Sequence, residues 1–227
     1  MITRRAFSNA LSLSGVAAFT GFAPLHLMTG AQANGTAGNV AEPVSLPEMA
    51  LGPADAAVTV TEYASITCPH CAAFNENVFP RIKAAYIETG KIRYVFREFP
   101  LDPVAAASSV LSRCIANGDS AKYFVVTDQL FRQEWSKVTK PRETLNQIGK
   151  QAGLDEDQVG ACLKDDALFN AIVAGRTFAT AKLGVNSTPT FLINGDKIVG
   201  NTPFEEFDRR IKALLDHMGT GTAPNPR

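Results

Sequence analysis

The sequence has no excess of charge of either sign. Its 22 lysines and arginines are matched by 22 aspartates and glutamates among 227 residues. Residues 1–33 hold two arginines and no acidic residue, so the rest of the chain has 20 basic and 22 acidic residues. Strong electrostatic attraction to nucleic acid or to an anionic membrane surface requires a basic protein, so neither is expected as a partner.

Histidine and cysteine are also scarce, with three of the former and four of the latter. Beyond the N-terminal segment only His70 and His217 remain, and Cys114 and Cys162 are isolated in the sequence. A structural zinc ion needs four tetrahedral ligands, and the closely spaced cysteines at 68 and 71 have no second ligand pair to complete such a site. We therefore predict no metal site.

The apolar run near the N-terminus, Ala10 to Ala23, is too short to cross a bilayer comfortably, since a spanning helix needs about 20 apolar residues. Paired arginines at 4 and 5 precede it, and Ala-Gln-Ala at 31–33 offers a cleavage site. Residues 1–33 are predicted to be a cleaved export signal, of the twin-arginine-like or the general secretory type. An uncleaved membrane anchor is the alternative.

The stretch Cys68-Pro69-His70-Cys71 carries the chemistry of the chain. Residues 58–63 before it alternate as a half-buried strand does, and apolar residues after it recur at helical spacing. Pro69 suits the first helical position, where its missing N–H would have no partner anyway. Cys68 then lies at a helix N-terminus, which stabilises a thiolate. We predict a redox dithiol with Cys68 as the nucleophile.

The remaining patterns predict an α/β fold. A leader is expected at 34–52, with a short strand near 44–49. A strand at 58–65, a helix at 68–89 kinked by Pro80 and a strand at 92–99 follow, and then helices across 102–184. The chain continues with a hairpin of 190–193 and 197–199 around Asn194-Gly195 and a helix opened by a capping box at 202–205. Residues 220–227 are expected to be a flexible tail. The order β-α-β, helices, β-β-α predicts a mixed sheet with an inserted all-helical domain.

The Cys-Pro-His-Cys stretch on a β-α-β unit, the helical insertion and Ser187-Thr188-Pro189-Thr190 before a hairpin together resemble the DsbA family. These are thioredoxin-fold thiol:disulfide oxidoreductases of the bacterial periplasm, and the resemblance covers roughly residues 53–217. It implies a thioredoxin-like domain made of 53–101 and 185–219, with the insertion at 102–184. It also implies a periplasmic location and no organic cofactor.

The same resemblance assigns roles to residues of this chain. Cys68 is expected to be the exposed attacking cysteine and Cys71 the buried resolving one. His70 is expected to stabilise the Cys68 thiolate through its N–H and positive charge. Pro189 matches the family's cis-proline facing the dithiol, and Thr188 offers its backbone to an extended substrate segment.

Glu62 matches an acidic residue beneath the active site of the family, which serves in proton transfer to or from Cys71. The alternative is that Glu62 points to solvent on the outer face of its strand.

The implied cycle passes the disulfide from Cys68 and Cys71 to reduced secreted proteins through a mixed disulfide on Cys68. A quinone-linked membrane partner of the DsbB type then reoxidises the pair, and the protein is expected to be a monomer. A threonine before the cis-proline also occurs in disulfide isomerases and reductive members, although residues 34–52 are too short for their dimerisation domain. An isomerase or reductase is therefore the main alternative, and a metal-binding protein using Cys68, His70 and Cys71 is a minor one.

Assigning Cys68 to Cys71 leaves Cys114 and Cys162 as the second pair. Both lie on apolar faces of expected helices, where a bond or two buried thiols would fit equally well. An oxidising compartment favours a structural disulfide, which we predict.

Overall fold

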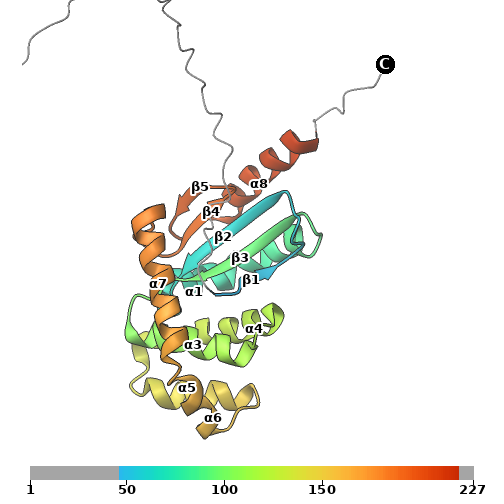
Figure 1. Ribbon diagram of the computed structural model, residues 1–227. Coiled ribbons are helices and arrows are strands. Elements are labelled where there is room, and N and C mark those ends of the chain that lie inside the picture. Colours follow the sequence, from blue (N-terminus) through green and yellow to red (C-terminus); the bar gives the residue numbers. More distant parts are fainter. Residues whose placement is uncertain (1–45, 220–227) are drawn as a thin grey trace, which may run out of the picture. The chain divides into compact units, whose positions relative to one another are not determined.

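The computed structural model describes residues 46–219, and the expectations for residues 1–33, 34–45 and 220–227 lie outside them. Five strands form one mixed sheet in the order β1-β3-β2-β4-β5 (Figure 1). They are β1 (Met49–Leu51), β2 (Val58–Ala64), β3 (Ile92–Glu98), β4 (Thr190–Ile193) and β5 (Asp196–Val199). β2 and β3 run parallel, and the other three pairs are antiparallel. This is the expected α/β fold, a thioredoxin-like sheet.

The helices come in two sets. Around the sheet lie α1 (Pro69–Asn77), α2 (Phe79–Ile82), the π-helical turn η1 (Lys83–Ile87) and α8 (Phe204–Gly219). Between β3 and β4 follow α3 (Pro103–Ala116), α4 (Ser120–Phe131), the 3-10 turn η2 (Trp135–Lys137), α5 (Pro141–Gln151), α6 (Glu156–Cys162) and α7 (Asp166–Leu183). Among residues 46–219, none of these helices combines the length and apolar character that a membrane crossing requires.

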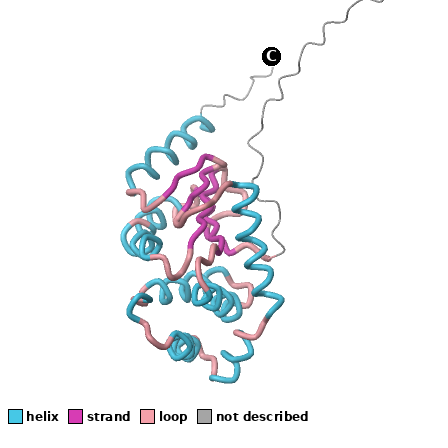
Figure 2. The backbone as a smooth tube through the Cα atoms, turned by 90° about the vertical axis from the view of Figure 1, so that its left-hand side faces the viewer, coloured by secondary structure: helices cyan, strands magenta, loops and turns pink. Residues whose placement is uncertain are grey.

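The sheet is covered on both faces, as Figure 2 shows with the strands enclosed by helices. On one face, Phe74 of α1 packs against Phe191 of β4 and Phe207 of α8, with ring centroids 4.5 and 5.5 Å apart. On the other face, Ala179 of α7 belongs to a cluster with Tyr63 and Leu192. A strand between two helical layers buries side chains of both faces, so β2 lacks a solvent-facing side near its C-terminal end.

The helical insertion shares its core with the sheet. A single buried cluster joins Ala64 of β2 and Phe96 of β3 to residues of α3, α4, α5 and α6. Buried polar groups link the same elements, because Arg113 of α3 donates to both carboxylate oxygens of Glu98, at 2.5 and 2.9 Å, and the Tyr123 hydroxyl donates to Glu98 at 2.8 Å. The inserted helices therefore depend on β3 for part of their packing.

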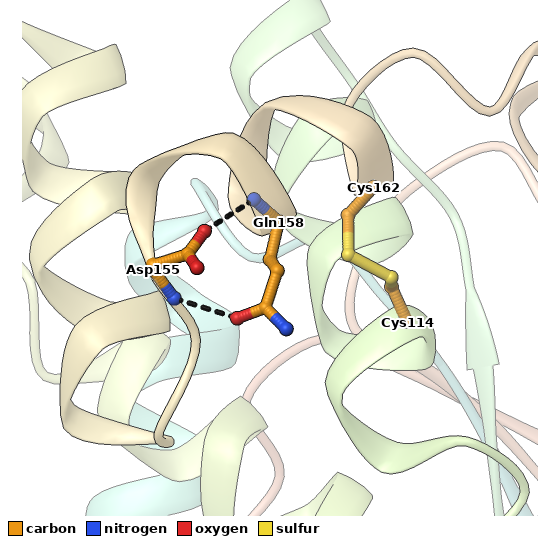
Figure 3. Close-up of a disulfide and its surroundings, with 4 residues drawn as sticks. All are labelled: Cys114, Asp155, Gln158 and Cys162. Carbon is orange, nitrogen blue, oxygen red and sulfur yellow. Dashed lines mark hydrogen bonds between the residues drawn. A yellow bond between two sulfur atoms is a disulfide. The ribbon is translucent and has the colours of Figure 1, made fainter.

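The predicted disulfide between Cys114 and Cys162 is present and joins α3 to α6 (Figure 3). α6 begins with a capping box, in which Asp155 accepts from the N–H of Gln158 and the Gln158 side chain accepts from the N–H of Asp155, each at 2.8 Å. The capping box fixes where α6 starts, and the disulfide fixes its other end against α3.

Replacing Cys114 and Cys162 together by alanine should lower the free energy of unfolding by about 4 kcal/mol. The bond closes a loop with a sequence separation of 48 residues, and the chain-entropy treatment of such a loop gives this magnitude. Urea unfolding of both proteins in the absence of reductant measures the difference. Equal midpoints and slopes would contradict the expectation.

The kink predicted at Pro80 is present as a break in the helix expected over 68–89. α1 ends at Asn77, and α2 starts at Phe79 with Pro80 in its first turn, where a missing N–H is tolerated. Two other local expectations need correction. The strand expected near 44–49 lies further along, at β1, where Met49 pairs with Phe96. The capping box expected at 202–205 does not form, since the Thr202 hydroxyl donates to the carbonyl of Gly200 and α8 begins at Phe204.

Candidate active site

The dithiol begins α1, directly after β2. Cys68 is the N-cap residue, with extended backbone angles φ −79° and ψ 120°, and Pro69 follows in the first turn. A turn holds Cys68 in place, because its N–H donates to the carbonyl of Ser65 at 3.0 Å while its carbonyl accepts from the N–H of Ala72 at 3.0 Å. Both cysteines are reduced, and they share the end of one helix.

Cys68 is less exposed than expected of an attacking cysteine. Its exposed fraction is 6%, and that of Cys71 is 0%. The reason is the loop before β4, since the Cys68 thiol donates to the carbonyl of Thr188 at 3.4 Å and is covered by that contact. The loop that carries Thr188 therefore covers the Cys68 sulfur.

The surroundings of Cys68 lower the pKa of its thiol from 9.0 to about 5. The largest cause is the hydrogen bond that the Cys71 thiol donates, and burial opposes it. The Thr188 hydroxyl and the backbone N–H groups of Cys71 and His70 lower the pKa further. Cys68 is consequently a thiolate at neutral pH, and the thiolate is the nucleophilic form of a cysteine.

Cys71 has the opposite character. Burial, the hydrogen bond to Cys68 and the charge of Glu62 all raise the pKa of its thiol far above the usual range. Cys71 therefore remains protonated while Cys68 is ionised, and it serves as the donor that stabilises the Cys68 thiolate. The pKa values of the two thiols are thus shifted in opposite directions.

Thr188 lies against the dithiol through its carbonyl, and Pro189 follows it. The peptide bond between them is cis, and the carbonyl of Pro189 accepts from the N–H of Gly200 at 2.8 Å, which attaches the loop to the end of β5. The Thr188 hydroxyl is buried and has no hydrogen-bond partner of ordinary geometry, yet its dipole still acts on Cys68.

Replacing Thr188 by valine should raise the pKa of Cys68 above about 5, because valine keeps the shape of threonine and removes the hydroxyl that helps to stabilise the thiolate. The pH dependence of the ultraviolet thiolate absorbance measures this pKa. Thr190→Val is a matched control, since the Thr190 hydroxyl is buried nearby but donates to the carbonyl of Ser187 at 2.8 Å. An unchanged Cys68 pKa in Thr188→Val would contradict the assignment.

Glu62 lies inside the molecule, and the alternative of a solvent-facing side chain is wrong. Its exposed fraction is 4%, and the Tyr94 hydroxyl donates to its Oε2 at 2.6 Å, while Oε1 has no partner. Burial raises the pKa of Glu62 to about 8, the Tyr94 hydrogen bond opposes the rise, and the nearby Cys68 thiolate adds to it. At neutral pH Glu62 is thus a buried carboxylic acid that still holds its proton.

His70 contributes less than the resemblance implies. Its backbone N–H lowers the pKa of Cys68, but its ring charge is not among the causes of that shift. The side chain is exposed to solvent at the start of α1. His70 therefore acts on Cys68 through the backbone of the helix N-terminus.

Three residues around the dithiol did not follow from the sequence. Tyr94 holds Glu62, and it sits opposite Val60 in the β2–β3 register, which is two residues from Glu62 on the same face. The Thr67 hydroxyl donates to Asp102, which also accepts from the N–H of Ala105 at 2.8 Å and so caps α3. Thr67 and Asp102 join the dithiol turn to the insertion. The alternation of β2 and β3 could have suggested Tyr94, but no sequence signal pairs Thr67 with Asp102.

The metal-binding alternative finds no support in the site. Among residues 46–219, no group of three or more histidine, cysteine, aspartate or glutamate side chains is placed so that it could hold a metal ion. Cys68, His70 and Cys71 do not form such a group, since His70 points to solvent and Cys71 is buried.

Comparison with known proteins gives consistent results. Residues 45–213 match a family model described as thioredoxin. Two curated relatives are named "Putative protein-disulfide oxidoreductase". The protein from Rickettsia bellii is 37% identical over 65% of this chain and 57% of its own length. The protein from Rickettsia conorii is 34% identical over 75% of this chain and 61% of its own length. The chain thus spans about three fifths of the length of these relatives.

Solved structures give the same fold. The crystal structure of Wolbachia pipientis alpha-DsbA1 superimposes with a TM-score of 0.70 at 31% identity, over 76% of this chain and 93% of that one. Oxidised BdbD from Bacillus subtilis superimposes with a TM-score of 0.67 at 21% identity, over 75% of this chain and 94% of that one. At this identity the likeness shows the fold alone. From the family match and the alpha-DsbA1 likeness together, the chain belongs to the thioredoxin family and, within it, to the DsbA-type oxidoreductases.

Proposed function

We propose that this protein oxidises dithiols in exported proteins by transferring its own Cys68–Cys71 disulfide. A substrate thiolate attacks the Cys68 sulfur, the Cys68–Cys71 bond breaks, and Cys71 takes the bonding electron pair. A mixed disulfide now joins the substrate to Cys68. A second substrate thiolate attacks the substrate's own sulfur in that bond, the substrate leaves with a disulfide, and Cys68 remains as a thiolate.

The observation that carries this proposal is the low pKa of Cys68, about 5. A stabilised Cys68 thiolate lowers the free energy of the dithiol form relative to the disulfide form. Each pKa unit is about 1.4 kcal/mol, so the bias toward the dithiol form is large. A protein that is more stable with its dithiol reduced gives its disulfide away, which is the behaviour of an oxidant.

Glu62 completes the proton balance. When Cys71 leaves the broken disulfide, its thiolate is buried and must gain a proton, because burial raises the pKa of its thiol. Glu62, protonated up to about pH 8, supplies that proton, and its carboxylate later recovers one from solvent. The Tyr94 hydroxyl orients Glu62 through its bond to Oε2.

The proposed partners follow from the resemblance and the site. Reduced exported proteins are the substrates, held along the backbone at Thr188, and this backbone edge does not by itself select a sequence. A DsbB-type, quinone-linked membrane protein reoxidises the dithiol. The protein would act in the periplasm as a monomer, after removal of an export signal near Ala33.

The test is the redox equilibrium of the protein with glutathione, measured by alkylating free thiols over a series of glutathione ratios. We expect the dithiol form to predominate until the buffer is strongly oxidising, and dithiol peptides to be oxidised stoichiometrically by the disulfide form. A potential in the range of reducing thioredoxins, near −270 mV, would contradict the oxidant proposal.

The threonine before the cis-proline makes the isomerase alternative worth a parallel assay. Reactivation of scrambled ribonuclease, with little oxidation of reduced dithiol peptides, would favour the isomerase instead.

A further inference from the structure

A cavity of about 650 Å³ lies beside Cys68, and Thr188 and Pro189 are not part of its lining. It lies between α1 on one side and the end of α4 with the η2 turn on the other, and it is open to solvent. Its apolar wall consists of Ile66, Ala72, Ala73, Phe131 and Trp135. We name it the Trp135 cavity. None of the roles assigned to the dithiol so far uses it.

Two residues of the apolar wall of the Trp135 cavity are held by contacts within the protein. The Trp135 indole N–H donates to the carbonyl of Leu130 at 2.9 Å, which holds the ring at the end of α4. Phe131 packs edge-on against Phe96 of β3, with ring centroids 6.2 Å apart. A cavity of this volume with an apolar wall is typical of a site that binds a side chain or a small ligand.

The polar side of the cavity is acidic. Glu76, Asp128 and Glu134 contribute three carboxylates, against the single guanidinium of Arg132. Arg132 donates hydrogen bonds of 2.8 and 3.2 Å to Asp128. Lys137, which is not part of the lining, forms a salt bridge with Glu134 at 2.9 Å. Glu76 on the exposed side of α1 therefore supplies the net negative charge at the mouth.

Small residues keep the cavity open toward the dithiol. Ala72 and Ala73 follow Cys71 on α1 and present only methyl groups to the space. Cys68 is itself part of the lining, so a segment joined to Cys68 lies next to the cavity. In an extended segment the next residue lies about 3.3 Å further along, which brings its side chain to the entrance.

We propose that the Trp135 cavity is a specificity subsite that takes a large apolar side chain next to the substrate cysteine, with a lysine or arginine of the same segment placed at Glu76. The occupant is thus a cysteine-containing, apolar and basic segment of a reduced exported protein. This inference rests on the proposed function, since the mixed disulfide at Cys68 holds the segment in place. Acidic segments are disfavoured, because they would meet Glu76.

The test compares rates of oxidation of dithiol peptides by the disulfide form of the full protein. One peptide carries Phe and Lys beside its reactive cysteine, a second carries Ala and Lys, and a third carries Phe and Glu. Each rate is divided by the rate with dithiothreitol, which has no side chain to place in the cavity. We expect the first peptide to react at least about tenfold faster than either of the others, as burial of one aromatic side chain allows.

Two variants separate the apolar and the charged parts of the subsite. Trp135→Ala should abolish the preference for Phe over Ala, and Glu76→Lys should reverse the preference for Lys over Glu. Phe169→Ala and Asp55→Lys are the matched controls, since Phe169 is 41% exposed on α7 and Asp55 is exposed before β2. Glu76 is exposed, so its variant reports on charge even if Trp135→Ala fails to fold.

Direct binding gives a second readout, because Trp135 is the only tryptophan of the chain. Its fluorescence should change on addition of the Phe-Lys peptide with its cysteines replaced by serine, and should change less with the Phe-Glu peptide. If the protein oxidises dithiothreitol and the three peptides, and the three peptide rates are equal, the subsite is overturned while the proposed function stands. A protein that oxidises neither dithiothreitol nor peptides would overturn the proposed function itself.

Discussion

The reduced protein should resist urea better than the oxidised protein, and the difference should grow by about 5 kcal/mol between pH 5 and pH 9. The cause is Cys68, whose pKa falls from 9.0 in the unfolded chain to about 5 in the folded one. Between these values the folded protein has released a proton that the unfolded chain still binds. A rise in pH therefore favours the folded reduced state, and about 3 kcal/mol of the effect is present by pH 7.

The oxidised protein has no Cys68 thiolate, so this contribution is absent from it. Urea unfolding of both redox forms at several pH values between 5 and 9 measures the difference directly. Reduced Cys68→Ser lacks this contribution, so its stability should fall further below that of the reduced wild type as the pH rises, which isolates the thiolate from other titrating groups. A redox difference in stability that is constant with pH would rule out a thiolate at position 68 as its source.

Replacing Glu62 by glutamine should stabilise the protein above pH 8 by up to about 5 kcal/mol. The pKa of Glu62 rises from 4.5 in the unfolded chain to about 8 in the folded protein, so the folded state holds a proton that the unfolded chain has lost. Stability from this group is complete below pH 4.5 and is lost as the pH rises through about 8. Glutamine keeps the carbonyl that accepts from Tyr94 and does not ionise.

The two groups act in opposite directions in the reduced protein. Between pH 5 and 8 Cys68 adds stability with rising pH and Glu62 removes it, so the wild type should show a shallow profile. Reduced Glu62→Gln should instead become steadily more stable as the pH rises. The variant should also transfer its disulfide more slowly, because Cys71 loses its proton donor.

Tyr94→Phe is the companion variant for Glu62. The Tyr94 hydrogen bond lowers the pKa of Glu62, so its removal should move the alkaline loss of stability to higher pH. Glu62→Gln with the same pH profile as the wild type, in either redox state, would show that Glu62 does not titrate inside the fold.

Local sequence signals were sufficient for the parts of the fold that depend on neighbours in the chain. Cys68 at the start of a helix followed from Pro69, and the hairpin followed from Asn194-Gly195, whose φ angles of 47° and 98° are those that a two-residue turn of this kind requires. The Cys114–Cys162 pairing followed from the cysteine count.

Features that depend on packing across the chain could not be predicted. Strand alternation left the direction of Glu62 open because helices cover both faces of β2, so neither face is marked by polar residues. The burial of Arg113 with Glu98 depends on how α3 lies against β3. The place of Trp135 beside Cys68 likewise depends on the path of the chain after α4, which no local pattern encodes.

The pairing of β2 with β4 has a consequence for how the protein matures. Tyr63 of β2 lies opposite Thr190 of β4, so β2, the strand before the dithiol, can pair with β4 only after more than a hundred further residues have been synthesised. A nascent chain that ends within α7 already carries all four cysteines but lacks Thr188 and its hydrogen-bonding contact to Cys68. Reactivity at Cys68 should therefore change when synthesis passes β4, so an immature chain differs chemically from the finished one.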